Sequence, residues 1–136
     1  MKKSQKILFV CVENAGRSQM AEGFFRKYAH KFEAISAGTK PTVSLIPEVV
    51  EAMHEIGIDI TKQKPKLLSN EMIEESIKTV NMGCIDKKSC PSLFLKDVID
   101  WNIIDPKGKS LEEIKKIRDH IKSETLTLIK KLEDDL

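Results

Sequence analysis

Short runs of apolar, β-forming residues alternate along the chain with segments whose apolar residues recur at helical spacing. The run Ile7–Val12 shows no polar alternation, which is typical of a strand buried on both faces. Further strands are predicted at Phe32–Ser36, Ile77–Met82 and Asp97–Ile103. The pattern therefore predicts four strands separated by helical segments.

Four helices are predicted between and after these strands. They span residues 18–29, 47–57 and 71–76, and the last begins after Ser110, whose hydroxyl can cap it. Strands that alternate with helices favour an α/β fold: three layers, with a four-stranded parallel sheet and helices on both faces. At 136 residues, the chain is expected to form a single domain over residues 1–136.

Composition and charge narrow the function classes. Charged residues make up 32% of the chain, but the net charge is only +2 and lysines alternate with acids, so no nucleic-acid partner is expected. No apolar run is long enough to span a membrane, and Ile7–Val12 is too short for a signal peptide. We therefore expect a cytoplasmic protein without a membrane partner. Its three cysteines, an odd number, argue against a disulfide framework.

Candidate chemistry begins at Cys11, at the carboxyl end of the first predicted strand. Ligands of parallel sheets bind beyond this edge, and a loop that leads into a helix can direct backbone N–H groups at an anion. Arg17 offers a planar fork for two oxygens of a tetrahedral oxyanion, and its charge would hold Cys11 as a thiolate. The Ser18 hydroxyl could donate a hydrogen bond to the same sulfur. The alternative is a buried core thiol, since a lone Cys-x5-Arg spacing is a weak signal.

The loop between Cys11 and the helix has the residue types that an anion cradle needs. Gly16 can adopt any backbone angle, and Asn14 tolerates positive φ. The residues expected to surround an oxyanion are Glu13, Asn14, Ala15, Gly16, Arg17 and Ser18.

The stretch C-V-E-N-A-G-R-S-Q-M-A-E, residues 11–22, resembles the phosphate-binding loop of the low-molecular-weight protein tyrosine phosphatase superfamily. Its R-S-Q-M-A-E continuation is most similar to the thioredoxin-coupled arsenate reductases. The resemblance continues in order through S-A-G-T, E-I-G-I-D-I, N-M-G-C and W-N-I-I-D-P. It implies a flavodoxin-like fold and an enzyme that reduces arsenate to arsenite. We expect a monomer, without a metal or a cofactor.

The resemblance also assigns catalytic roles. Cys11 would attack arsenate held by Arg17, and Asp105 of the Asp-Pro pair would protonate the leaving oxygen. Cys84 would then attack Cys11 and release arsenite. Cys90 would move the disulfide to Cys84–Cys90, where thioredoxin or a similar thiol reduces it.

The same residues also allow interpretations without a catalytic role. Asp105-Pro106 on its own also fits the start of a turn. Cys84 and Cys90 could be incidental, while a zinc pair is disfavoured because no partner Cys or His lies near them in the sequence.

Two departures from the phosphatases bear on the substrate. Glu13 stands where they typically have glycine, and its carboxylate is expected to point away from the oxyanion. Lys107-Gly108-Lys109 follows the Asp-Pro pair, where the phosphatases tend to carry aromatic residues that grip phosphotyrosine. The second departure disfavours an aryl phosphate.

Lys66 falls about where some of these reductases use an acidic side chain to bind potassium beside the loop. We expect its ammonium group to take the place of that cation. Asn14, Ser36 and Glu22 are expected to brace the loop. A solvated lysine cluster is the alternative interpretation of this segment.

Two other functions compete with arsenate reduction. The first is a low-molecular-weight phosphatase that hydrolyses phosphate monoesters through a cysteinyl-phosphate, which would not need Cys84. The second is an oxyanion-binding redox sensor without turnover, which would not need Asp105.

Overall fold

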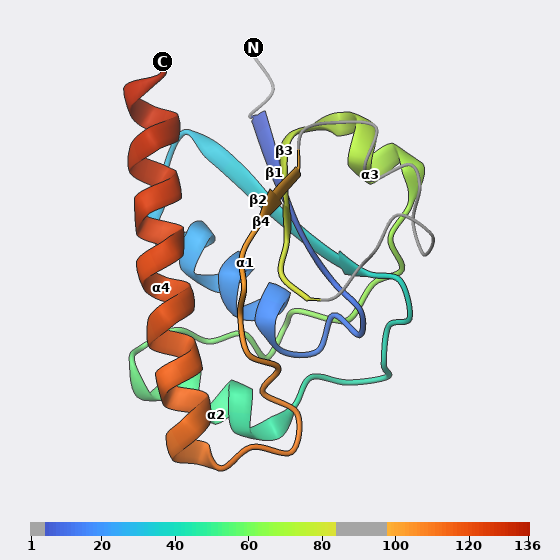
Figure 1. The fold of residues 1–136 in the computed structure, drawn as a ribbon, viewed down its shortest axis with the longest axis vertical. Helices are drawn as coiled ribbons and strands as arrows, with labels where there is room; N and C mark the ends of the chain where they lie inside the picture. Colours follow the sequence, from blue (N-terminus) through green and yellow to red (C-terminus); the bar gives the residue numbers. More distant parts are fainter. Residues whose placement is uncertain (1–4, 84–97) are drawn as a thin grey trace.

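The computed structural model describes residues 5–83 and 98–136. Its sheet has the order β2-β1-β3-β4, and each adjacent pair of strands is parallel (Figure 1). The strands are β1 (Gln5–Cys11), β2 (Phe32–Gly38), β3 (Ser76–Asn81) and β4 (Val98–Asp100). The predicted four-stranded parallel sheet is confirmed.

Helices cover both faces of this sheet. They are α1 (Arg17–Tyr28), α2 (Pro47–Glu55), α3 (Asn70–Glu75) and α4 (Leu111–Asp134). The helices α1 and α2 pack with α4 on one side, whereas α3 lies on the other (Figure 1). The three-layer prediction is confirmed, and the helix ends differ from the predicted ones by one or two residues. Among the helices of the described residues, not one has the length and apolar character needed to cross a bilayer.

The central strand β1 supplies apolar side chains to both cores. Ile7 and Phe9 belong to the core formed with α1, α2 and α4, while Leu8 and Val10 belong with Ile73 of α3 to the core on the opposite face. The four β1 side chains have no exposed surface. The absence of polar alternation in the sequence therefore reflects burial on two faces, as predicted.

The fourth strand is shorter than the predicted Asp97–Ile103, of which Asp97 lies outside the described residues. Pairing with β3 covers Val98–Asp100, and the backbone N–H of Trp101 still donates to the Asn81 carbonyl at 3.0 Å. Trp101 and Ile103 are then buried against the α4 core without further strand pairing. The predicted end of this strand was wrong, because apolar residues indicate burial but do not show that hydrogen bonding to the neighbouring strand continues.

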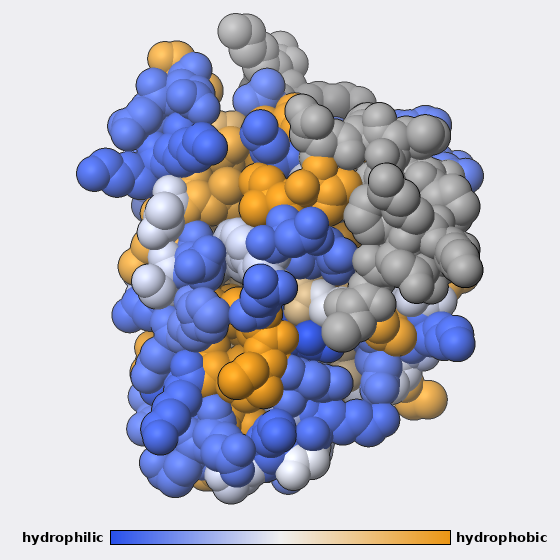
Figure 2. Space-filling model, viewed as in Figure 1, coloured by the Kyte–Doolittle hydropathy of each residue, from blue (hydrophilic) through white to orange (hydrophobic). Residues whose placement is uncertain are grey.

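The segment from Trp101 to Ser110 leads across the lower part of the molecule into α4 (Figure 1). Figure 2 shows mainly polar side chains along α4, with apolar surface between α4 and this segment. Ile104 is the large apolar residue of the segment that stays exposed. The segment thus covers the core with Ile103 and presents Ile104 and Asp105 to solvent, whereas Pro106 is buried again.

Ser110 caps α4 as predicted. Its hydroxyl oxygen accepts a hydrogen bond from the Glu113 N–H at 3.2 Å, and the Glu113 carboxylate accepts one from the Ser110 N–H at 3.4 Å. Hydrogen bonds from the Ser110 side chain and backbone lower the pKa of Glu113. This reciprocal capping box satisfies backbone donors that the first turn of a helix otherwise leaves unpaired.

Replacing Ser110 by Ala is expected to lower the free energy of unfolding by about 1 kcal/mol, because the N-cap acceptor is lost. Chemical denaturation measures the change. Ser123→Ala is the matched control, since Ser123 is exposed within α4 and alanine is the better helix former. Equal stabilities of the two variants would contradict the capping role.

Candidate active site

The loop after β1 lies at the carboxyl edge of the sheet, where the chain continues to β2 on one side and later to β3 on the other. This arrangement is a topological switch point, the usual ligand site of open α/β sheets. A pocket of about 320 Å³ opens there. Its lining comprises Cys11, Val12, Glu13, Ala15, Gly16, Arg17, Ile46, Ile103, Asp105, Pro106 and Lys107. The structure thus brings together most of the predicted site residues.

Cys11 lies at the base of this pocket and is almost completely buried. Its sulfur accepts a hydrogen bond from the backbone N–H of Asn14 at 3.2 Å. The same sulfur lies 2.9 Å from the Ser18 hydroxyl. Two groups therefore contact the sulfur at the distances of hydrogen bonds, which is unlike the environment of an apolar core thiol.

The orientation of the Asn14 amide decides the direction of the bond between Ser18 and Cys11. The backbone N–H of Lys66 can only donate, and it lies 2.9 Å from Oδ1 of Asn14. Nδ2 of Asn14 consequently faces the Ser18 hydroxyl and donates to its oxygen at 2.7 Å. The hydroxyl hydrogen of Ser18 is then available to donate a hydrogen bond to the sulfur of Cys11.

Asn14 adopts a positive φ of 53°, in agreement with the tolerance predicted from its residue type. Gln19 donates from Nε2 to both the backbone oxygen and Oδ1 of Asn14, each at 3.0 Å. Gln63 in turn donates to Oε1 of Gln19 at 2.8 Å. Sequence reasoning missed both glutamines. The adjacency of Gln19 to Arg17-Ser18 could have pointed to it, whereas Gln63 had no local signal.

Arg17 joins the loop to the segment that follows β4. It donates to the Ile103 carbonyl at 3.0 Å, and its guanidinium nitrogen lies 3.8 Å from the Asp105 carboxylate. The Arg17 side chain is only 10% exposed, whereas that of Asp105 is 59% exposed. A buried cation and an accessible carboxyl group therefore border the same pocket as Cys11, which suits oxyanion binding and proton delivery.

Gly83 is a further residue that sequence reasoning missed. A Cβ at this position would overlap the guanidinium group of Arg17. The glycine therefore leaves the space in which Arg17 lies. The N-M-G-C motif contained this signal, because glycine permits close approach of a neighbouring group.

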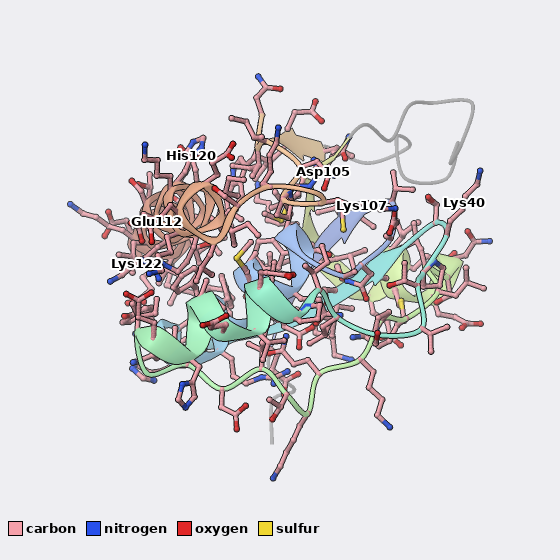
Figure 3. The ribbon with its side chains drawn as sticks, turned by 90° about the horizontal axis from the view of Figure 1, so that it is seen from below. Lys40, Asp105, Lys107, Glu112, His120 and Lys122 are labelled. Carbon is pink, nitrogen blue, oxygen red and sulfur yellow. The ribbon has the colours of Figure 1, made fainter. Side chains whose placement is uncertain are left out.

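The Glu13 side chain points to Lys107, with 3.0 Å between Oε1 and Nζ. The hydrogen bond and the charge of Glu13, with a smaller contribution from Asp105, raise the pKa of Lys107. The backbone N–H of Lys107 donates to Oδ1 of Asp105 at 3.0 Å. Figure 3 shows Asp105 and Lys107 close together on the segment before α4, at a distance from the labelled residues of α4 itself.

A second polar group lies behind the loop, around the buried carboxylate of Glu22. Glu22 accepts a hydrogen bond from Ser36 at 2.8 Å and pairs with Arg26 at 2.8 Å. The Lys66 ammonium lies 3.8 Å from the same carboxylate. These contacts agree with the expected bracing by Asn14, Ser36 and Glu22. The replacement of a potassium ion by Lys66 stays a prediction.

Cys84 and Cys90 lie outside the described residues. Gly83, the residue before Cys84, contacts Arg17 at the edge of the oxyanion loop. Among residues 5–83 and 98–136, no three His, Cys, Asp or Glu side chains are grouped so that they could hold a metal ion.

A thiol that accepts hydrogen bonds at the exit of a parallel strand, with an arginine and a carboxyl group beside it, defines a cysteine-dependent site for oxyanions. The family model of low molecular weight phosphotyrosine protein phosphatases matches residues 6–136. The chain belongs to this family.

Arsenate reductases are among its relatives. The arsenate reductase of Staphylococcus aureus strain Newman is 37% identical over 118 residues, which cover 85% of this chain and 89% of that protein. A solved arsenate reductase in the phosphate binding state has a TM-score of 0.84 and 31% identity, and covers 93% of this chain and 98% of its own. The thioredoxin-dependent arsenate reductase of Corynebacterium glutamicum has a TM-score of 0.83 and 32% identity, with 99% of this chain and 65% of that chain covered.

Ser18→Ala tests the hydrogen bond to the sulfur. In a Cys84→Ser/Cys90→Ser background, where Cys11 is the remaining cysteine of the sequence, the variant is expected to alkylate with iodoacetamide more slowly at neutral pH. We expect a decrease of about tenfold, the effect of losing one hydrogen bond to a charged group. Ser44→Ala, at an exposed serine that does not line the pocket, should alkylate at the background rate.

Gly83→Ala tests the space for Arg17. The added Cβ displaces the guanidinium group, so inorganic phosphate is expected to bind about tenfold more weakly, equivalent to one lost charge-assisted hydrogen bond. Isothermal titration calorimetry gives the Kd, and circular dichroism checks the fold. Gly108→Asn is the control, because nothing lies within 4 Å of a Cβ there and Asn tolerates its φ of +76°. Unchanged phosphate affinity in Gly83→Ala would contradict the steric argument.

Proposed function

We propose that this protein is an arsenate reductase that uses three cysteines in sequence and is regenerated by thioredoxin or a similar dithiol reductant. The observation that carries the proposal is the convergence of Cys11, Arg17 and Asp105 on one pocket. The 37% sequence identity to an arsenate reductase over 85% of the chain adds support. We further propose that it acts as a monomer in the cytoplasm.

The first step is formation of a bond between sulfur and arsenic. The N–H groups of the loop and the Arg17 guanidinium hold the arsenate oxygens above Cys11, and the thiolate attacks arsenic. One oxygen leaves, and Asp105 supplies the proton that makes it a better leaving group. The exposure of Asp105 allows its carboxyl group to regain a proton from solvent.

The second step transfers two electrons. The Cys84 thiolate attacks the sulfur of Cys11, and the electron pair of the sulfur–arsenic bond stays on arsenic, which leaves as arsenite. Cys90 then attacks Cys84 and releases the Cys11 thiolate. The external dithiol reduces the resulting Cys84–Cys90 disulfide by the same exchange chemistry. All three cysteines of the chain are used in this scheme.

Hydrolysis of phosphate monoesters is the second candidate. The match to the phosphatase family supports it, and Cys11, Arg17 and Asp105 are sufficient for a cysteinyl-phosphate route. A sensor without turnover is less well supported, because a binding site alone has no need of a carboxyl group placed 3.8 Å from the arginine.

Cys84→Ser separates these functions. The variant is expected to lose arsenate turnover with a thioredoxin system, followed through NADPH consumption, because no second thiol can release arsenite. It should keep whatever activity the wild type has on para-nitrophenyl phosphate, since phosphate transfer needs only Cys11.

Undiminished arsenate turnover in Cys84→Ser would contradict the cascade. A wild type that hydrolyses the aryl phosphate but does not reduce arsenate would be a phosphatase. Phosphate binding without either activity would favour the sensor.

A further inference from the structure

The two segments at the mouth of the oxyanion pocket are joined by an ion pair. Glu13 comes from the loop after β1 and Lys107 from the segment before α4, and 94 residues separate them in the sequence. Their charged atoms lie 3.0 Å apart, and both residues line the pocket. The Glu13 side chain is 34% exposed, which places it at the rim of the pocket.

The pair holds the segment that carries Asp105. Lys107 contacts Glu13 through its ammonium group, and its own N–H binds the Asp105 carboxylate at 3.0 Å. On the inner side, Arg17 binds the Ile103 carbonyl at 3.0 Å. The segment is therefore attached to the oxyanion loop on both sides of Asp105.

Pro106 closes the remaining distance between the two segments. A Cβ at Gly16 would overlap the Pro106 ring, so the ring lies directly against the loop backbone. Glu13, Lys107 and Pro106 all line the pocket, and their contacts join the two segments on this side of its mouth. An ester group attached to a bound phosphate has to leave the pocket past its rim, whereas a free tetrahedral oxyanion carries no such group.

We propose that the Glu13–Lys107 ion pair determines substrate specificity by holding this side of the mouth closed, so that the pocket prefers inorganic oxyanions to phosphate monoesters. The inference rests on the proposed function insofar as the oxyanion binds above Cys11. It gives Glu13 a role through its side chain, whereas the backbone of Glu13 belongs to the anion loop.

The charges of the pair also affect oxyanion affinity, and this effect has to be separated from closure. An unpaired Glu13 carboxylate would repel a dianion, and an unpaired Lys107 ammonium would attract it. Inorganic phosphate and phenyl phosphate are both dianions above neutral pH, so charge alters both affinities in parallel. The ratio of the two dissociation constants therefore reports on closure of the mouth.

The experiment measures this ratio by isothermal titration calorimetry in a full-length Cys11→Ala background, which has no nucleophile at this position. The variants are Glu13→Gln, Lys107→Gln, the double variant, and the exchange of charges Glu13→Lys/Lys107→Glu. Lys109→Gln is the matched control: it removes an exposed lysine of the same segment that does not line the pocket.

Both single variants and the double variant are expected to shift the ratio towards phenyl phosphate by about two- to fivefold, the range expected for an exposed ion pair. The exchanged pair should return the ratio towards that of the background, and Lys109→Gln should leave it unchanged. Phosphate alone should bind more tightly to Glu13→Gln and more weakly to Lys107→Gln.

A constant ratio in the single and double variants would overturn the proposal, even if phosphate affinity changed, because the pair would then act through charge alone. An exchanged pair that behaves like the single variants would also overturn it. A background that binds neither ligand would instead overturn the oxyanion site and the proposed function with it. The binding measurement does not depend on Cys84, on Cys90 or on a reductant. A protein that fails to reduce arsenate can therefore still confirm or contradict the role of the ion pair.

Discussion

The site depends on the left-handed backbone conformation of Asn14. At a φ of 53°, the backbone N–H of Asn14 turns back to the Cys11 sulfur, and its side chain faces Ser18 and Lys66. A residue other than glycine adopts this conformation at a cost, which the surroundings have to offset. Hydrogen bonds from Gln19 and Lys66 to Asn14 provide that stabilisation. The loop is thus shaped by polar contacts that satisfy each other, and no single helix cap determines it.

The sheet supplies the rigid frame for this loop. Because β1 is buried on both faces and paired on both edges, its carboxyl end cannot shift without disturbing two cores. Residues from separate parts of the sequence meet at this end, and Arg17 contacts two of them, Gly83 and Ile103. The Arg17 side chain is only 10% exposed, because Gly83 after β3 and Ile103 after β4 both lie against it. The geometry of oxyanion binding is consequently a property of the whole carboxyl edge.

The sequence was informative wherever the cause of a structure is local. Burial of β1, the capping of α4 by Ser110 and the tolerance of Asn14 for positive φ follow from residue types and their spacing, and the structure confirms them. The cysteine and arginine of the loop could be identified for the same reason.

Other features depend on contacts between distant segments. The strand β4 ends where its pairing with β3 ends. Gln63 acts through its hydrogen bond to Gln19, which lies 44 residues away in the sequence. Lys107 meets Glu13 across 94 residues, so the sequence indicated only that the Glu13 carboxylate should avoid the oxyanion. The structure supplies the partner that makes this arrangement stable.

The buried carboxylate of Glu22 is connected to the Cys11 sulfur through a chain of contacts behind the loop. A buried carboxylate is tolerated only when it is paired and hydrogen-bonded. Arg26 forms the ion pair with Glu22 and Ser36 donates a hydrogen bond to it, each at 2.8 Å. Lys66 contributes twice, since its ammonium lies 3.8 Å from Glu22 and its backbone N–H fixes Asn14.

The position of the Lys66 backbone therefore connects charge balance at Glu22 with the direction of the Asn14 amide. That direction leaves the Ser18 hydrogen for Cys11. The charge pairing at Glu22 is thus linked to the sulfur through three successive hydrogen-bond contacts. They join Lys66 to Asn14, Asn14 to Ser18 and Ser18 to Cys11, and no charged group of this network contacts the sulfur itself.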